Sequence, residues 1–201
     1  MENLSRKERE RRERIRHILN VAGALFARRG FFKVSMKDIA ERAEFALGTL
    51  YGFFKGKKQL YHQLIQEKID EQIRVISEQM ASETSPVGII KKFIEAKLRF
   101  FYDNLDFVRL YFAEMHGPPV YGENAHRRKY QELLGKITSV FEEGIKKGEF
   151  INAPAELLAA MLDGQTSALA FSWLEKTTPE SPEMEIELAK RVLLTGLLAK
   201  E

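Results

Sequence analysis

The residues with the clearest chemistry are the hydroxyl and lysine side chains that gather between Ser35 and Lys57. A hydroxyl donates a hydrogen bond to a phosphate oxygen and a lysine adds positive charge, so this combination suits a nucleic-acid backbone. For each of these side chains, the alternative interpretation is an ordinary solvated or packed surface residue. The candidates for phosphate contact are Ser35, Lys37, Thr49, Tyr51, Lys55 and Lys57.

Three small or apolar residues in the same stretch are candidates for contact with bases. Apolar side chains can touch thymine methyl groups, and a glycine lets a helix approach DNA closely. The segment from Glu44 to Phe54 contains no Arg, Asn or Gln, so bidentate base recognition is not expected there. Specificity is then expected from Lys37, Arg42, a basic N-terminal arm or DNA shape. The three residues are Ala46, Leu47 and Gly48.

Two short helices separated by a tight turn are expected to position these groups. Ser35 is a favourable helix N-cap, and Asp38 three residues later can complete a capping box. An apolar face follows at Ile39, Ala40 and Ala43, and a second one at Leu47, Leu50 and Tyr51. This spacing indicates a helix-turn-helix, whose second helix enters the major groove of DNA.

The stretch TLYGFFKGKKQLY, preceded by IAERA and a longer amphipathic helix, resembles the TetR family of transcriptional regulators. The close resemblance covers about the first 65 residues, and beyond them only the helical layout agrees. The matching positions are Ile39, Ala40, Ala43, Gly48, Thr49, Leu50, Tyr51, Phe54, Lys55, Lys57 and Leu60.

The resemblance implies an all-α protein in two parts. Residues 1–60 would form a three-helix DNA-binding region, and residues 61–201 a helical ligand-binding and dimerisation region. It further implies a homodimer through the last two helices, Ala155–Trp173 and Pro182–Leu198, on a pseudo-palindromic double-stranded operator. Repression would be relieved by a small apolar or aromatic inducer. In this family, the lysine at position 57 contacts a phosphate.

Two positions depart from the family pattern. The family usually has Gly in the turn, where this chain has Glu44, and Ser or Thr before the recognition helix, where it has Ala46. Loss of such a cap typically costs about 1 kcal/mol. These departures are the only support for an alternative function, a helical scaffold or ligand-sequestering dimer that no longer binds DNA.

The charge of the chain is distributed unevenly. Residues 1–60 contain 15 Lys and Arg against 7 Asp and Glu, a net charge of +8. The remaining residues contain 17 against 22, a net charge of −5. A basic region on an acidic remainder is expected when only the basic region meets phosphate. Within it, residues 6–16 are expected to form either a basic arm that touches DNA or a solvated helix end.

Helical periodicity continues through the rest of the chain. The first helix should end at Gly30, after which Phe31, Phe32 and Val34 should fill the N-terminal core. A helix from Lys57 to Met80 would be about 36 Å long.

Further helices are expected on both sides of a loop over residues 117–124. One should begin near Val87, a short one should be capped by Asp106, and a long one should stop at Gly148. The helix Ala155–Trp173 is apolar on most sides and should therefore be buried. A last loop is expected over residues 177–182.

A ligand pocket is expected in the C-terminal region, from apolar side chains with a few polar ones. Ordinary core packing is the alternative for the aromatic residues. Gln165 and Thr166 are the better polar candidates, since polar groups on a buried helix need partners; those partners could also come from a second subunit. The candidates are Phe101, Arg109, Tyr111, Met115, His116, Phe141, Met161, Gln165, Thr166 and Trp173.

Several classes of function are not expected. The chain has no cysteine, which excludes disulfides and thiolate metal sites. Its four histidines show no metal-ligand spacing, and no phosphate loop or nucleophile motif occurs, so we expect no catalytic residues, metal or cofactor. No apolar run approaches the roughly 20 residues of a membrane span, and no secretion signal is visible. A cytoplasmic protein is expected.

Overall fold

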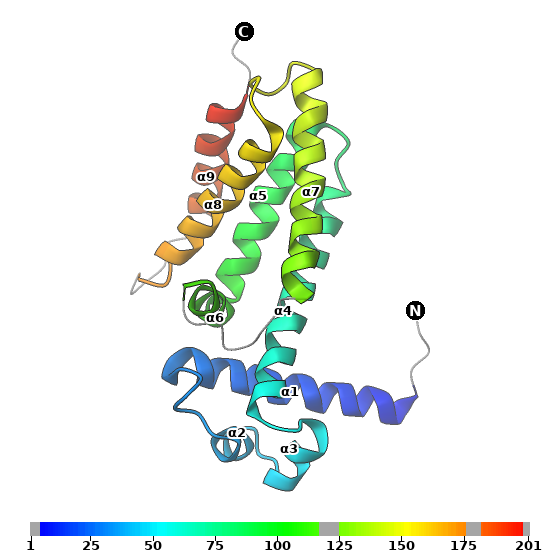
Figure 1. Cartoon of the computed structure of the whole chain (residues 1–201), viewed down its shortest axis with the longest axis vertical. Helices are drawn as coiled ribbons and strands as arrows, with labels where there is room; N and C mark the ends of the chain where they lie inside the picture. The colour runs from blue at the N-terminus through cyan, green and yellow to red at the C-terminus, as the bar shows by residue number, and fades with distance from the viewer. Residues whose placement is uncertain (1–4, 117–124, 176–181, 199–201) are drawn as a thin grey trace. The chain divides into compact units, whose positions relative to one another are not determined.

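A computed structural model describes residues 5–116, 125–175 and 182–198, and every regular element within them is an α-helix (Figure 1). The chain divides into two compact units. The first unit comprises the described residues of 1–68 and 109–122, and the second comprises those of 69–108 and 123–201. Among the helices in the described residues, none combines the length and apolar character needed to cross a bilayer.

The first unit is built on helix α1, Arg6–Arg29, whose ends are defined by two local signals. Ser5 and Glu8 form a capping box at its start, so helical structure reaches to the beginning of the basic arm. Gly30 ends it as expected, with a φ of 79° that favours glycine. The inner face of α1 is fully buried at Ile18, Ala22 and Phe26.

Helices α2, Met36–Arg42, and α3, Leu47–Phe53, form the expected helix-turn-helix. The Ser35 hydroxyl accepts from the Asp38 N–H, and the Asp38 carboxylate accepts from the Ser35 N–H, which confirms the predicted capping box. In the turn, Glu44 has a φ of 59°, a conformation in which glycine has no Cβ penalty. Helix α2 packs against both α1 and α3.

An aromatic cluster follows α1. Phe31 lies 5.5 Å from the Phe26 ring and 5.0 Å from the Tyr61 ring between centroids, and Val34 is buried as expected. The prediction that Phe32 fills the core was wrong, because its side chain is 82% exposed. The turn between Gly30 and Val34 directs two adjacent rings differently, and only Phe31 faces the cluster.

The second unit consists mainly of α5, Pro86–Asp103; α7, Ala125–Lys146; α8, Ala155–Ser172; and α9, Pro182–Leu197. Helix α5 is central and packs against the other three, as Figure 1 shows, because nearly all of its positions facing them are apolar. Helix α4, Lys57–Met80, has its predicted bounds and contributes residues 69–80 to this unit.

Close packing and a backbone hydrogen bond hold the connection between α7 and α8 in place. The Phe150 ring lies against Gly144 so closely that a Cβ there would overlap it, and the Ile151 N–H donates to the Leu197 carbonyl at 2.9 Å. Gly148 has a φ of 74° and ends this turn. The expected stop near Gly148 is therefore confirmed.

Two details of the predicted helices need correction. Helix α6, Leu105–His116, begins one residue before Asp106, which lies in its first turn and is not its cap. Helix α8 is not buried on all sides in the single chain, since Leu157, Met161 and Phe171 are 43–52% exposed. The predicted loops over 117–124 and 177–182 lie outside the described residues, except for Pro182, which is the first residue of α9.

Candidate nucleic-acid interface and buried polar cluster

Helix α3 presents one packed face and one open face. Leu50 and Phe54 are buried at 0% and 1% exposure, so they attach the helix to its unit. Leu47 and Tyr51 are 39% and 54% exposed, and nothing lies within 4 Å of where a Cβ would stand on Gly48. The outer face of α3 is therefore accessible and partly smooth, which suits the close approach of another macromolecule.

The start of α3 lacks the cap that a Ser or Thr would supply. Ala46 is the N-cap in an extended conformation, and its side chain makes no capping bond. The Thr49 N–H bonds to the Ala46 carbonyl at 2.9 Å, while the Thr49 side chain is half-buried. The exposed N-terminal end of α3 is thus a region of partial positive charge from its backbone N–H groups.

Ser35 and Lys37 lie at the start of α2. The Ser35 hydroxyl is engaged with Asp38, and its hydrogen bonds, from side chain and backbone, lower the pKa of the Asp38 carboxyl. Lys37 is exposed, with its ammonium 3.8 Å from the Glu41 carboxylate on the next turn. Such an exposed pair is weak, so Lys37 can exchange this partner for another anion.

Lys57 has a structural set of contacts at the start of α4. Its ammonium donates to the Phe31 carbonyl at 2.9 Å and to the Val34 carbonyl at 2.8 Å, and lies 4.4 Å from the centre of the Phe31 ring. It therefore joins α4 to the loop that precedes α2. Lys55, by contrast, is exposed, and its backbone N–H donates to the Gln59 side chain.

All nine residues predicted to contact DNA lie in the first unit, on three neighbouring segments. Five belong to α3 and its N-cap, two to the start of α2, and two to the entry of α4. Exposure is high except at Thr49 and Lys57, which are half-buried. The group is Ser35, Lys37, Ala46, Leu47, Gly48, Thr49, Tyr51, Lys55 and Lys57.

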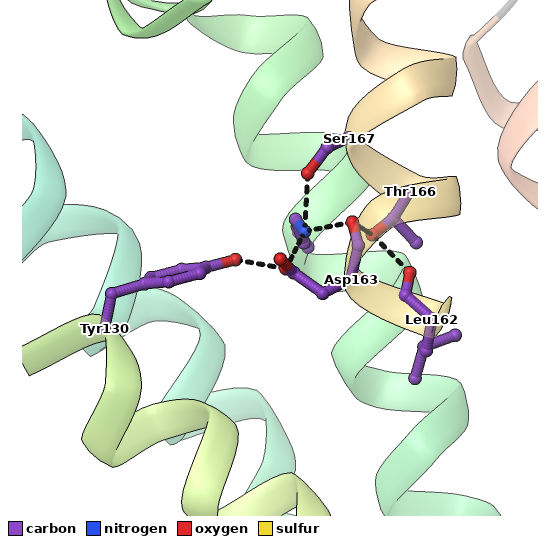
Figure 2. A network of polar contacts seen from close by, with 6 residues as sticks. Tyr130, Leu162, Asp163, Thr166 and Ser167 are labelled. Carbon is purple, nitrogen blue, oxygen red and sulfur yellow. Dashed lines mark hydrogen bonds and ion pairs between the residues drawn. The ribbon is translucent and has the colours of Figure 1, made fainter. Parts of the chain in front are cut away.

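The second unit contains a buried ionic cluster (Figure 2). Lys97 on α5 is completely buried and donates to the Asp163 carboxylate, to the Asp163 carbonyl at 3.0 Å and to the Ser167 hydroxyl at 3.0 Å. The Tyr130 hydroxyl, on α7, donates to the same carboxylate, so the cluster joins three helices.

Aromatic rings complete the surroundings of Lys97. Its ammonium lies 5.7 Å from the centres of both the Phe93 and Phe101 rings. Burial lowers the pKa of Lys97, and the Asp163 carboxylate opposes that shift. All three ammonium donors have acceptors, so the cluster holds its charge by local compensation.

The sequence prediction did not include Lys97, Asp163 or Tyr130 as a group. One signal was present: Lys97 stands between Phe93 and Phe101 at four-residue spacing, on the apolar face of its helix. A lysine in that register is buried and needs a carboxylate partner. Its partner is 66 residues further along the chain, and no local pattern identifies it.

Known bacterial regulators resemble this chain in sequence. The family described as "Bacterial regulatory proteins, tetR family" matches residues 18–64, which include α2, α3 and the start of α4. The Bacillus subtilis protein called "Uncharacterized HTH-type transcriptional regulator YhgD" is 24% identical over 93% of this chain and 98% of its own length. The chain belongs to the TetR family.

Further TetR-family proteins match along nearly the whole length. The "HTH-type transcriptional repressor KstR2" of Mycolicibacterium smegmatis is 22% identical, with 90% of this chain and 88% of that protein covered. The structure of the ketosteroid transcriptional regulator KstR2 of Mycobacterium tuberculosis has a TM-score of 0.77 at 19% identity, covering 93% and 96% of the two chains. The fatty acid degradation regulator FadR from Bacillus halodurans gives 0.75 at 21%, covering 93% and 97%. The chain is thus a TetR-family transcriptional regulator with an all-α fold.

The predicted ligand residues of this TetR-family regulator are divided between the two units. Phe101, Phe141, Thr166 and Trp173 are buried in the second unit, and the Thr166 hydroxyl already bonds to the Leu162 carbonyl at 2.8 Å. Met161 and Gln165 lie on the exposed face of α8. Arg109 and Tyr111 belong to the first unit, and the side chains of Met115 and His116 lie outside the described residues.

In residues 5–116, 125–175 and 182–198, no three His, Asp or Glu side chains are grouped so as to hold a metal ion. The family consists of regulators and not of enzymes.

Proposed function

We propose that this chain is a repressor that binds a pseudo-palindromic operator as a homodimer and is released by a small apolar or aromatic compound. The observation that carries the DNA-binding part is the accessible face of α3, where Leu47, Gly48 and Tyr51 are exposed beside an uncapped, positive helix end. The relative KstR2 of M. smegmatis is named a repressor, which supports this sign of regulation. Repressor action on chromosomal DNA would place the protein in the cytoplasm.

Each predicted DNA contact has a distinct role in this proposal. Tyr51, Thr49, Lys37 and Lys55 would contact phosphates, and Ser35 would contribute through the N-terminus of α2. Lys57 would act mainly by fixing the loop before α2, with the start of α4 facing phosphate. Base preference would come from methyl contacts at Ala46 and Leu47 and from DNA shape.

The proposed dimer uses the last two helices. Helix α8 exposes Leu157, Met161 and Phe171, and α9 exposes Met184, Leu188 and Val192, all between 43% and 61%. Apolar faces of this extent usually mark an interaction site, and a second copy would bury them in a four-helix contact. Residues 1–60 would then bind DNA, and residues 61–201 would hold the ligand and the partner.

The proposed inducer would bind the second unit and favour a dimer geometry that does not fit DNA, with α4 carrying the shift. Among the described residues, Gln72 on α4 is a buried side chain whose amide nitrogen has no hydrogen-bond partner. Such a donor suits an acceptor on an otherwise apolar compound. A ketosteroid and fatty acids, which appear in the names of two structural neighbours, are both of that kind.

Selection of bound duplexes from a random pool tests DNA binding. We expect an inverted repeat whose half-site centres are about 34–36 Å apart or a multiple of that spacing. Tyr51→Ala should lose affinity for it, whereas Tyr102→Ala, a change in the second unit, should not. Recovery of no duplex would contradict the proposal and favour a scaffold.

Sedimentation of single variants tests the dimer. Leu188→Glu places a charge in the proposed interface and should yield monomers at concentrations at which the wild type is dimeric. Phe32→Glu, at an exposed apolar position of the first unit, should leave the dimer intact. A wild-type protein that is monomeric at micromolar concentration would contradict the proposed dimer.

Thermal unfolding with fatty acids and ketosteroids tests the ligand class. A bound compound should raise the unfolding temperature and weaken operator binding. Gln72→Leu should reduce the response, while Gln79→Leu, an exposed position of the same helix, should not. Ligand binding that leaves operator affinity unchanged would exclude induction.

A further inference from the structure

Helix α1 extends beyond the core of the first unit as an exposed, charged rod (Figure 1). Its side chains from Arg6 to Arg14 are all exposed, although the capping box at Ser5 and Glu8 starts a regular helix there. A helix is not required at these positions for packing. The regular helix instead sets the direction in which each cationic side chain points.

Two contacts identify the side of α1 that faces the helix-turn-helix. The Arg11 guanidinium lies 5.6 Å from the centre of the Phe53 ring, on α3. Further along, a His17 ring nitrogen is 3.3 Å from the Ala43 carbonyl, in the turn between α2 and α3, and the ring packs edge-on against Phe45. Both contacts are within the first unit.

Helical spacing places three cations on this same side. Lys7, Arg11 and Arg14 follow one another at intervals of four and three residues, and the series continues to Ile18, which is buried in the core. One acidic residue on this side, Glu10, is paired with Arg6 at 2.9 Å. The inner face of α1 thus changes from apolar, where it packs, to cationic, where it projects.

We propose that Lys7, Arg11 and Arg14 form a second DNA contact, in which α1 holds phosphates of the duplex that flanks the sequence read by α3. This inference rests on the proposed function, because it needs DNA on the open face of α3. The three residues span about 10 Å along the helix. Positive charge at that spacing fits successive phosphates and requires no particular base sequence.

The chain offers a matched control on the opposite side of the same helix. Arg9, Arg12 and Arg16 are also exposed, and their loss changes the net charge by the same amount. The test compares the triple variants Lys7→Gln/Arg11→Gln/Arg14→Gln and Arg9→Gln/Arg12→Gln/Arg16→Gln. Glutamine keeps the helix propensity close to that of Arg and Lys.

Affinity for the selected duplex is measured against salt concentration and against the length of flanking DNA. The slope of log affinity against log salt is negative, and the first variant should make it shallower by about 2.7 per bound protomer, because three phosphate contacts are lost. Trimming the flanks should weaken the wild type and the control variant but not the first variant. Arg11→Lys/Arg14→Lys should behave as the wild type, since phosphate contact needs only charge.

Equal behaviour of the two triple variants on a duplex that the wild type binds would overturn this inference and leave the proposed function standing. Absence of any specific duplex for the wild type would overturn both. Circular dichroism should show equal helix content in the two variants. If only the first variant loses helix content, the affinity of the wild type for trimmed duplexes is the deciding measurement. A wild-type affinity that trimming leaves unchanged would overturn the inference.

Discussion

Most lysines of the first unit are exposed, whereas Lys97 of the second unit is completely buried. In the first, Lys7, Lys37 and Lys55 are exposed, and the ion pair of Lys37 is long. In the second, Lys97 is 0% exposed and has three acceptors. The same chemical group is therefore open to solvent at these positions of one unit and part of the internal structure of the other.

The largest expected effect comes from breaking the buried pair. Asp163→Ala removes the counter-ion of Lys97 and should reduce the free energy of unfolding by about 3 kcal/mol. Lys97→Met removes the charge itself and should cost less. The control is Lys129→Met, which breaks the exposed 2.6 Å pair with Asp70 and should cost about 1 kcal/mol or less.

Urea unfolding of the three variants gives these values. If Asp163→Ala and Lys129→Met reduced the free energy of unfolding by equally small amounts, removing the counter-ion of Lys97 would carry no extra cost.

Two glycines, Gly144 and Gly48, separate core packing from the proposed DNA contact. Gly144→Ala should destabilise the protein by about 2 kcal/mol, because the new methyl group overlaps the Phe150 ring and the core must shift. Gly48→Ala meets open space on α3 and should not destabilise the fold, but it should weaken DNA binding by blocking close approach. Paired measurements of unfolding and of operator affinity should therefore separate the two. If Gly144→Ala reduced DNA affinity without reducing stability, the assignment of Gly144 to core packing would be wrong.

Lys57 and Lys55 contrast a structural lysine with an exposed lysine in one short segment. Lys57→Met should cost about 2 kcal/mol of stability, since two carbonyls lose a charged donor. Lys55→Met should leave stability unchanged and reduce the salt dependence of DNA binding. If Lys57→Met affects only DNA binding, its contacts with Phe31 and Val34 are not structural.

Glu44 is expected to give a smaller effect of opposite sign. Its φ of 59° disfavours side chains with a Cβ, so Glu44→Gly should raise the free energy of unfolding by about 0.5–1 kcal/mol. The control Glu41→Gly, in a helix, should destabilise by a similar amount. Destabilisation by both substitutions would show that the turn is not strained.

The smallest expected effect is a pH dependence at the start of α2. The pKa of Asp38 is lowered by its hydrogen bonds from Ser35, so its ionised form stabilises the folded state. This contribution is complete above the ordinary carboxyl pKa and is lost as the pH falls through the lowered value. Asp38→Asn should flatten the acid limb of the stability curve, and an unchanged limb would contradict this origin.

Local signals in the sequence predicted the first unit well. The capping box at Ser35, the stop at Gly30 and the helix from Lys57 to Met80 depend on neighbouring residues, and the structure confirms them. Phe32 was predicted wrongly because the direction of a ring after a glycine depends on the turn, and composition does not reveal that direction.

Long-range pairing explains what the sequence did not predict in the second unit. Lys97 meets a partner on another helix, and this pairing depends on how α5, α7 and α8 pack. Which side of α8 stays exposed in the single chain could not be predicted, because a helix that is apolar on most sides has the same pattern whether its own chain or a second copy covers it. The DNA contacts and the ligand residues remain predictions.

In the proposed function, the open face of α3 and the cations around it bind duplex DNA. The most direct measurement is the affinity of the full chain for its selected duplex between 50 and 200 mM salt. We expect the affinity to fall about a thousandfold or more, as it does when six or more phosphates are neutralised. An affinity that does not change with salt would contradict it.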